Sequence, residues 1–284
     1  QVQHGEIFGF LGPNGAGKTT TIRCMLDQIR PNGGVLRVLG LNPQTDAVAV
    51  RRRVGYLPGE LHIEGNFTVE GALRYFNRLR GNQAQWSYIH QLAERLDLAL
   101  KTPVKNLSKG NKQKIGLILA LMHRPELLLL DEPTFGLDPL MQQEVLKLVM
   151  EARSNSATVF LSSHILSEVE ITTDRVGIIR QGVVVEVADT SALVNRSLRR
   201  VKIRFRQPVD ATGIVQLPGI ELLSKAVNLT AGDDLSLTLQ VEGEMDALIK
   251  ALAAFPVVDF ETERASLEEI FLAYYEKDAD GGGK

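Results

Sequence analysis

The stretch IFGFLGPNGAGKTT, residues 7–20, contains the pattern that decides the fold. Ile7–Leu11 has the length and the apolar character of a buried strand. Gly12–Thr19 then fits the phosphate-loop pattern GxxxxGK-S/T, and a helix is expected from Lys18 onward. Glycines let the backbone N–H groups of such a loop point at phosphate oxygens, and the helix N-terminus adds positive potential. The stretch therefore predicts an α/β domain that binds a nucleotide.

Individual residues of this loop have distinct expected roles. Lys18 supplies a positive charge to the β- and γ-phosphate oxygens, and the Thr19 hydroxyl can coordinate Mg²⁺. The predicted nucleotide contacts are Gly12, Pro13, Asn14, Gly15, Ala16, Gly17, Lys18, Thr19 and Thr20.

The composition of the chain excludes several classes of protein. In 284 residues, 44% are apolar and 23% are charged, which is typical of a globular protein and not of a disordered one. The net charge of −2 lacks the basic excess of a general nucleic-acid binder, so no nucleic-acid partner is expected. The single cysteine, Cys24, excludes an internal disulfide framework. The sequence shows no run of about 18 apolar residues that could cross a membrane.

Short apolar runs alternate with amphipathic segments up to about residue 190. The predicted strands are Ile7–Leu11, Val35–Leu39, Val54–Leu57, Leu127–Leu130 and Thr158–Leu161, followed by a strand pair around the turn Gln181-Gly182. The predicted helices are Lys18–Ile29, Thr68–Leu79, Gln85–Leu96, Ser108–Met122, Pro139–Ser154 and Leu166–Thr173. Wholly apolar strands between helices predict a mostly parallel sheet that is covered on both faces.

Two carboxylates end the apolar run at residue 130. Asp131 is expected to lie beside the phosphate loop and to hold Mg²⁺ through its water shell. Glu132 is expected to point at the γ-phosphate and to polarise the attacking water. An acidic strand end alone is weak evidence, but together with a phosphate loop it predicts hydrolysis.

Three further polar segments accompany the acidic pair. Ser108 and Gly110 open a predicted helix, where they form either an anion site or an ordinary N-cap. The segment GLDP, residues 136–139, follows the acidic pair. His164 ends the next strand, at the edge of the sheet where ligands of parallel α/β proteins bind.

In this order the five motifs resemble the ATP-binding subunit of an ABC transporter. The phosphate loop is GPNGAGKTT, the signature is LSKGN at residues 107–111, and LLLLDE is the Walker B segment. GLDP corresponds to the D-loop and His164 to the switch histidine. The resemblance covers about residues 5–185 and implies a P-loop NTPase fold with a mostly parallel sheet and a helical signature subdomain.

The resemblance implies a partner and a site shared between subunits. Two ATPase subunits pack head to tail, and Ser108, Gly110 and Asn111 contact the ATP that is bound to the other protomer. Asp138 lies at the dimer seam, and His164 contacts the γ-phosphate. Closure around ATP and Mg²⁺ then drives a membrane permease subunit, which places this chain peripherally on the cytoplasmic face of a bacterial or archaeal cell membrane.

The chain departs from the family pattern at a few positions. Lys109 replaces a signature glycine, and Asn111 replaces the signature glutamine. Gly59 stands where the family has its Q-loop glutamine, and Glu60 follows as a candidate substitute near Mg²⁺. The aromatic residue that normally stacks on adenine lies upstream in the family and has no match here, so we expect the ATPase domain to be truncated at its N-terminus.

The pattern of apolar and polar residues changes near residue 195. Val201, Ile203 and Phe205 alternate with basic residues, which predicts a half-buried strand with a solvated basic face at Lys202, Arg204 and Arg206. Further predicted elements are a strand over residues 235–241, a helix over 245–253, a strand over 257–260 and a helix over 266–275. The expected domains are an ATPase domain at 1–195, a small α+β accessory domain at 196–277, and a disordered tail at 278–284. The accessory domain resembles that of ABC-2 exporters, mainly through the ending SLEEIFLAYYE.

Other functions were weighed against the exporter subunit. The alternative is a soluble ABC ATPase with a single cassette that acts on a partner outside the membrane. A translation-factor type would carry two cassettes, and a DNA-repair type would insert a long coiled coil before the signature. A GTPase would need a base-reading NKxD motif, which NKQK at residue 111 is not.

Overall fold

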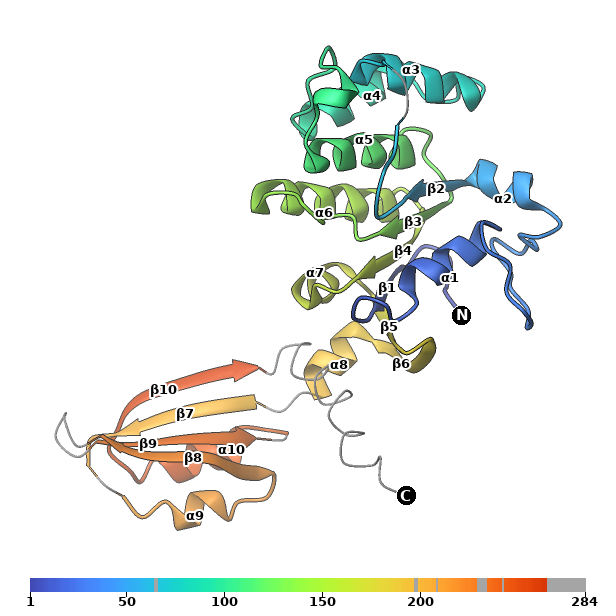
Figure 1. Ribbon diagram of the computed structural model, residues 1–284. Coiled ribbons are helices and arrows are strands. Elements are labelled where there is room, and N and C mark those ends of the chain that lie inside the picture. Colours follow the sequence, from blue (N-terminus) through green and yellow to red (C-terminus); the bar gives the residue numbers. More distant parts are fainter. Residues whose placement is uncertain (64–65, 197–198, 208, 229–233, 242, 265–284) are drawn as a thin grey trace. The chain divides into compact units, whose positions relative to one another are not determined.

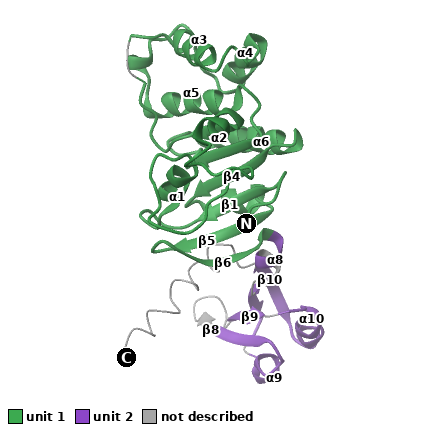
Figure 2. Cartoon of the chain, turned by 90° about the vertical axis from the view of Figure 1, so that its right-hand side faces the viewer, with its two compact units in different colours: residues 1–190 green, residues 191–284 purple. Residues whose placement is uncertain are grey.

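The computed structural model describes residues 1–63, 66–196, 199–207, 209–228, 234–241 and 243–264 (Figure 1). The chain divides into two compact units, residues 1–190 and residues 191–284 (Figure 2). Helix α8 (Thr190–Arg196) spans the division. Within the described residues, none of the helices has both the length and the apolar character needed to cross a bilayer.

A six-stranded sheet forms the centre of the first unit. Its strands, in chain order, are β1 (Ile7–Leu11), β2 (Val54–Leu57), β3 (Leu127–Asp131), β4 (Thr158–Ser163), β5 (Arg175–Arg180) and β6 (Val183–Asp189). They lie side by side in the order β2-β3-β4-β1-β5-β6. All neighbours are parallel except β5 and β6, which form an antiparallel pair. The predicted mostly parallel sheet is confirmed.

The apolar strands are buried on both faces because helices cover each side. Ile7 and Leu161 belong to one apolar cluster, whereas their strand neighbours Phe8 and Phe160 belong to another on the opposite face. Along β3 the residues alternate between the same two clusters. Such a strand has no polar position within its length, so its first polar groups stand at its end.

The helices of the first unit connect and cover these strands (Figure 1). They are α1 (Lys18–Met25), α2 (Ala47–Arg53), α3 (Val69–Leu79), α4 (Trp86–Arg95), the 3-10 helix η1 (Val104–Asn106), α5 (Lys109–Leu121), α6 (Pro139–Ser154) and α7 (Leu166–Thr172). Helix α5 packs closely on β2, because an added β-carbon at Gly116 would lie 2.5 Å from the Leu57 side chain. Helix α7 approaches β1 in the same way at Gly9.

Two predictions for this unit are wrong. The run Val35–Leu39 is not a strand: Val35 is 88% exposed, and Val38 makes only an isolated bridge to Leu41. The backbone turns sharply here, since Leu39 and Gly40 both adopt positive φ. The helix expected to reach Ile29 ends at Met25, and Asp27 lies in the left-handed region with a φ of 52°. Helix α2 was not predicted.

Beyond α8, the described residues of the second unit form a four-stranded antiparallel sheet and two helices. Its elements are β7 (Arg199–Phe205), α9 (Thr212–Val215), β8 (Ile220–Asn228), β9 (Asp234–Val241), α10 (Asp246–Leu252) and β10 (Val257–Arg264). The strand order is β10-β7-β9-β8. Side chains of both helices and one face of the sheet form its apolar core. Strand β8 was not predicted. The helix expected over residues 266–275 and the tail at 278–284 lie outside the described residues.

Candidate active site

The phosphate loop connects the central strand β1 to α1, as the sequence pattern predicts. At Gly12, an added β-carbon would lie 2.5 Å from the carbonyl oxygen of Ile179 on the neighbouring strand β5. Gly17 caps α1 with a φ of 112°, a conformation that favours glycine. The loop is closed by a hydrogen bond from the Ala16 N–H to the carbonyl of Pro13, at 3.1 Å. Close packing and backbone conformation therefore require glycine at these two positions.

Lys18 points back over this loop. Its Nζ donates to the carbonyl oxygens of Gly12 at 2.6 Å and Pro13 at 3.3 Å, and it lies 3.1 Å from Oε1 of Glu132. The lysine is 5% exposed. A buried ammonium group is thus held where the loop and the end of β3 meet.

Asp131 lies at the end of β3 and is 1% exposed. Its Oδ2 accepts a hydrogen bond from the Thr19 hydroxyl at 2.7 Å, and its Oδ1 accepts one from the Ser162 hydroxyl at 2.5 Å. The buried carboxylate therefore joins the start of α1 to β4. A carboxylate and a hydroxyl are the hard oxygen ligands that suit Mg²⁺, which keeps several of its own waters. The donor set fits this ion.

Glu132 connects two of the predicted site residues. Its Oε2 lies 2.7 Å from Nδ1 of His164, and its Oε1 lies beside Lys18. The residue adopts a φ of 51°, in the left-handed region that non-glycine residues rarely occupy. Strained residues of this kind cluster at functional sites, and here the turn aims the carboxylate at the phosphate loop.

A second group of predicted residues lies at the starts of α5 and α6. The Ser108 hydroxyl accepts from the Asn111 N–H at 3.2 Å, and Asp138 accepts from the N–H groups of Leu140 and Met141. An added β-carbon at Gly110 would lie 2.6 Å from the carbonyl oxygen of Gly136, so the two helix starts are close together. In the described part of the chain, no hydrogen bond or ion pair joins this group to residues 12–20.

The candidate metal residue Glu60 makes a different contact. Its Oε1 lies 3.2 Å from Nζ of Lys109, and its side chain is 67% exposed. The neighbouring position faces the acidic end of β3 instead: an added β-carbon at Gly59 would lie 3.3 Å from Oδ2 of Asp131. A role of Glu60 in metal binding stays a prediction.

Three residues that support this site are not among those expected from the sequence. Ser162 binds Asp131, and the buried Gln113 donates from its Nε2 to the carbonyl oxygen of Glu132 at 3.1 Å. Glu168 accepts from Thr134 at 2.8 Å, and burial raises the pKa of its carboxyl group. Ser162 had a signal, because it directly follows the apolar run at residues 159–161. Gln113 and Glu168 had none, since a polar residue on an amphipathic helix is ordinarily exposed.

The fold and this arrangement define a P-loop nucleotide-binding domain. The family described as ABC transporter matches residues 1–135. The bacitracin transport ATP-binding protein BcrA of Bacillus licheniformis is 38% identical over 218 residues, which cover 76% of this chain and 71% of that protein. The chain belongs to the ABC transporter family, as one of its ATP-binding subunits, and is an ATPase.

Solved structures agree with this assignment. The ATP-binding subunit of an ABC transporter is 29% identical, with a TM-score of 0.62 over 68% of this chain and 82% of that one. A dimeric ATP-binding cassette in a post-hydrolysis state, bound to ADP and Pi, has a TM-score of 0.58 over 67% of this chain and 88% of that one. At 18% identity, this second match shows the fold alone.

Proposed function

We propose that this site binds ATP with Mg²⁺ and that its hydrolysis powers export by a membrane permease. Two neighbouring groups of contacts support the proposal. Glu132 contacts both Lys18 and His164, and Asp131, the residue before it, accepts a hydrogen bond from Thr19, the residue after Lys18. Together these groups hold a cation, a general base and a pair of oxygen ligands within a few ångströms of one phosphate loop.

Residues 12–20 hold the nucleotide in this proposal. The backbone N–H groups of the loop and the start of α1 bind the phosphate oxygens. Lys18 neutralises the β- and γ-phosphates. Thr19 and Asp131 hold Mg²⁺, which when bound supplies positive charge that stabilises the leaving phosphate oxygens.

Glu132 and His164 act on hydrolysis. Glu132 accepts a proton from the attacking water. His164 holds the glutamate through the contact at 2.7 Å and also contacts the γ-phosphate.

The experiment that tests this site measures Mg²⁺-dependent release of phosphate from ATP by the purified chain. Asp131→Asn should reduce that release by on the order of 10²-fold, and a variant that retains the parental rate and the parental Mg²⁺ dependence would contradict the assignment.

A second protomer completes the site in this proposal. Ser108, Gly110 and Asn111 contact the nucleotide of the partner, and Asp138 lies at the seam between the two protomers. The exposed N-terminal ends of α5 and α6 support this, because they carry these residues to the surface together.

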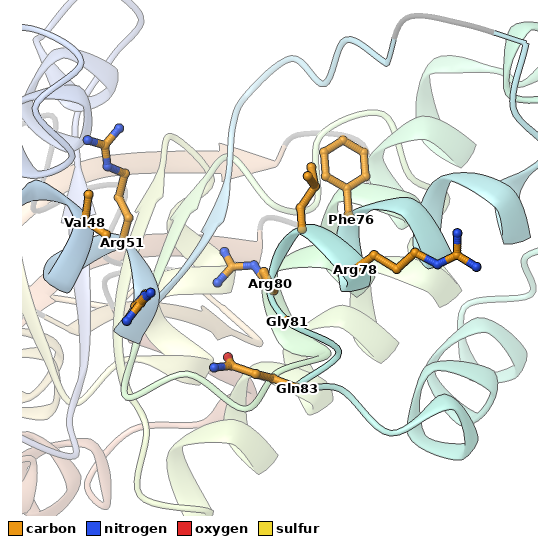
Figure 3. A pocket seen from close by; sticks show the side chains of 9 residues that line it. Val48, Arg51, Phe76, Arg78, Arg80, Gly81 and Gln83 are labelled. Carbon is orange, nitrogen blue, oxygen red and sulfur yellow. The ribbon is translucent and has the colours of Figure 1, made fainter.

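The membrane partner is proposed to dock at a groove between α2 and α3. The groove has a volume of about 790 Å³ and is lined by Val48, Arg51, Arg52, Phe76, Arg78, Leu79, Arg80, Gly81 and Gln83 (Figure 3). Val48 and Leu79 are each 65% exposed. Among the described residues, none of Arg51, Arg52 and Arg78 has a carboxylate partner. Positive charge beside exposed apolar side chains fits an acidic, amphipathic segment of the permease.

Reversing this charge tests the docking surface. Arg52→Glu together with Arg78→Glu should reduce co-purification with a co-expressed permease, because both changes place like charges against an acidic segment. ATP hydrolysis by the isolated subunit should stay within about twofold of the parent, since neither arginine contacts the phosphate loop. Unchanged co-purification would rule against this groove.

The soluble alternative is not favoured, because the relatives are ATP-binding subunits of transporters. That the transport direction is export, and not import, is inferred from the resemblance of the C-terminal sequence to that of ABC-2 exporters. With a permease as partner, the chain works peripherally at the cytoplasmic face of the membrane.

A further inference from the structure

A residue that departs from the family pattern contacts the residue that was expected to lie near Mg²⁺. Lys109 stands where the signature has glycine, and Glu60 follows the Q-loop position. In the structure, Nζ of Lys109 lies 3.2 Å from Oε1 of Glu60. These residues are 49 positions apart in the chain, so the contact joins the segment after β2 to the start of α5.

Lys109 also contacts the segment that follows β3. Its Nζ lies 4.7 Å from the centre of the Phe135 ring, within the range of a cation–π interaction. One side chain therefore lies between Glu60 and Phe135, which belong to the two segments that leave β2 and β3.

The start of α5 is joined to Glu132 by further contacts. Gly110 packs directly against the carbonyl of Gly136, and Gln113 donates to the backbone carbonyl of Glu132. Gln113 is 4% exposed, so this hydrogen bond is shielded from water. A displacement of the start of α5 would therefore alter the hydrogen bond to the backbone of Glu132, the proposed general base.

At the Q-loop position, no side chain can reach Asp131 because the residue is glycine. The position itself is close, since an added β-carbon at Gly59 would lie 3.3 Å from Oδ2 of Asp131. The carboxylate of this segment is instead directed to Lys109. One route by which the segment after β2 can influence the site therefore runs through Lys109 and α5.

We propose that Lys109 is a positioning residue for ATP hydrolysis, with Glu60 as its counter-ion. Its ammonium group holds the segment after β2 against Phe135 and the start of α5. Gln113, near the start of the same helix, in turn holds the backbone of Glu132 through its hydrogen bond. Among the described residues, no hydrogen bond or ion pair joins the Lys109 side chain to residues 12–20. The inference rests on the ATPase site proposed above.

The expected effect is small because the contact is partly solvated. The side chains of Lys109 and Glu60 are 56% and 67% exposed. Exposed ion pairs change an equilibrium by about two- to fivefold, and added salt weakens them. The test must therefore measure coupling between the residues and not the size of one mutation.

The experiment is a double-mutant cycle on the full chain. Steady-state ATP hydrolysis is measured for the parent, Lys109→Met, Glu60→Gln and the double variant, at low and at high ionic strength. Each single variant should lower kcat by about two- to fivefold and leave the KM for ATP unchanged. The double variant should be no worse than either single variant, because the same contact is lost in all three.

Conservative and matched controls separate positioning from loss of structure. Lys109→Arg should retain the parental kcat, since a guanidinium can bind a carboxylate and stack on an aromatic ring. The exposed pair Lys250–Asp246, at 2.7 Å in the second unit, is the control: Lys250→Met and Asp246→Asn should leave kcat unchanged.

Three results would overturn the inference. Effects of the two single variants that multiply in the double variant would show that the residues act independently. A raised KM with unchanged kcat would make Lys109 a nucleotide contact. Parental rates in all variants would show that the contact has no role in turnover. A parent that does not hydrolyse ATP would instead contradict the proposed function.

Discussion

The two units of the chain bury their strands in different ways. In the first unit, β1 and β3 are apolar along their length and have covered faces on both sides, so their polar side chains stand at the strand ends. In the second unit, β7 buries Val201, Ile203 and Phe205 on one face only. A sheet buried on both faces concentrates polar chemistry at one edge, whereas a half-buried sheet spreads charge along a strand.

The charges of the second unit pair across neighbouring strands. Nζ of Lys202 lies 3.8 Å from Oε1 of Glu263, and Nη2 of Arg204 lies 3.6 Å from Oδ2 of Asp259. The basic face expected from the sequence is thus partly neutralised by β10. In the first unit, by contrast, the charged groups at the strand ends meet around one phosphate loop. ATP chemistry is therefore expected to belong to the first unit.

The largest effect is expected at Lys18. Lys18→Ala removes the buried ammonium beside the loop, and ATP hydrolysis should fall by about 10³-fold or more, the range for losing one preorganised electrostatic contact to the reacting group. Lys250→Ala, in the second unit, is the matched control and should not change the rate. Phosphate release measures both. Comparable turnover in Lys18→Ala would contradict the assignment of ATP chemistry to this phosphate loop.

A core substitution in the second unit should disturb that unit alone. Phe205 is fully buried, and Phe205→Ala should lower the free energy of unfolding of the second unit by about 3–4 kcal/mol. ATP should still raise the unfolding temperature of the first unit, because no residue of the predicted site lies beyond residue 190. Scanning calorimetry with and without ATP measures both effects. Loss of the ATP-dependent shift would show that the second unit helps to build the site.

The pH dependence of stability should be concentrated in the first unit. Burial, with a smaller effect of Arg80, lowers the pKa of His123 to about 4, against about 6.5 in an unfolded chain. Between these values the unfolded chain binds a proton that the folded chain does not, so stability falls as pH drops from 6.5 to 4.

The variant His123→Gln should remove this part of the pH dependence. The difference from the parent should amount to about 1–2 kcal/mol at pH 4, after allowance for the partial exposure of the ring. Unfolding temperatures measured from pH 4 to pH 7 test it, with the transition of the second unit as internal reference. Parallel curves for parent and variant would rule out His123 as the cause.

The smallest effect is expected from removal of the second unit. A chain that ends at Asn195 should bind ATP with an affinity within about twofold of the full chain, because the predicted contacts all lie before that residue. Thermal stabilisation by ATP measures the affinity. Weaker binding by a truncated chain that remains folded would show that the second unit contributes to the ATP site.

The parallel sheet and the core of the site could be predicted because their signals are local. The phosphate loop fits a pattern whose spacing is set by the phosphates, and the ends of apolar strands carry Asp131 and His164. The contacts of Thr19 with Asp131 and of Glu132 with His164 follow from the sheet order, which brings β3 and β4 together near β1.

The remaining features depend on contacts that distant residues make. Val35–Leu39 has the composition of a strand but lacks a pairing strand among the described residues, and its backbone turns at Gly40. Strand β8 shows no regular alternation of apolar and polar residues, so the sequence gives no signal for it and only its pairing with β9 defines it as a strand. The Glu60–Lys109 contact depends on how closely α5 packs on β2, which no local pattern reports.

The most direct test of the proposed site compares ATP binding and ATP turnover in one preparation of Glu132→Gln. The substitution keeps the size and polarity of the side chain but removes the carboxylate proposed as the general base, which lies 2.7 Å from His164 Nδ1 and 3.1 Å from Lys18 Nζ. ATP affinity should be retained while turnover falls by about 10²-fold or more. Turnover at the parental rate would show that Glu132 is not the general base, and the proposed site would be wrong at its centre.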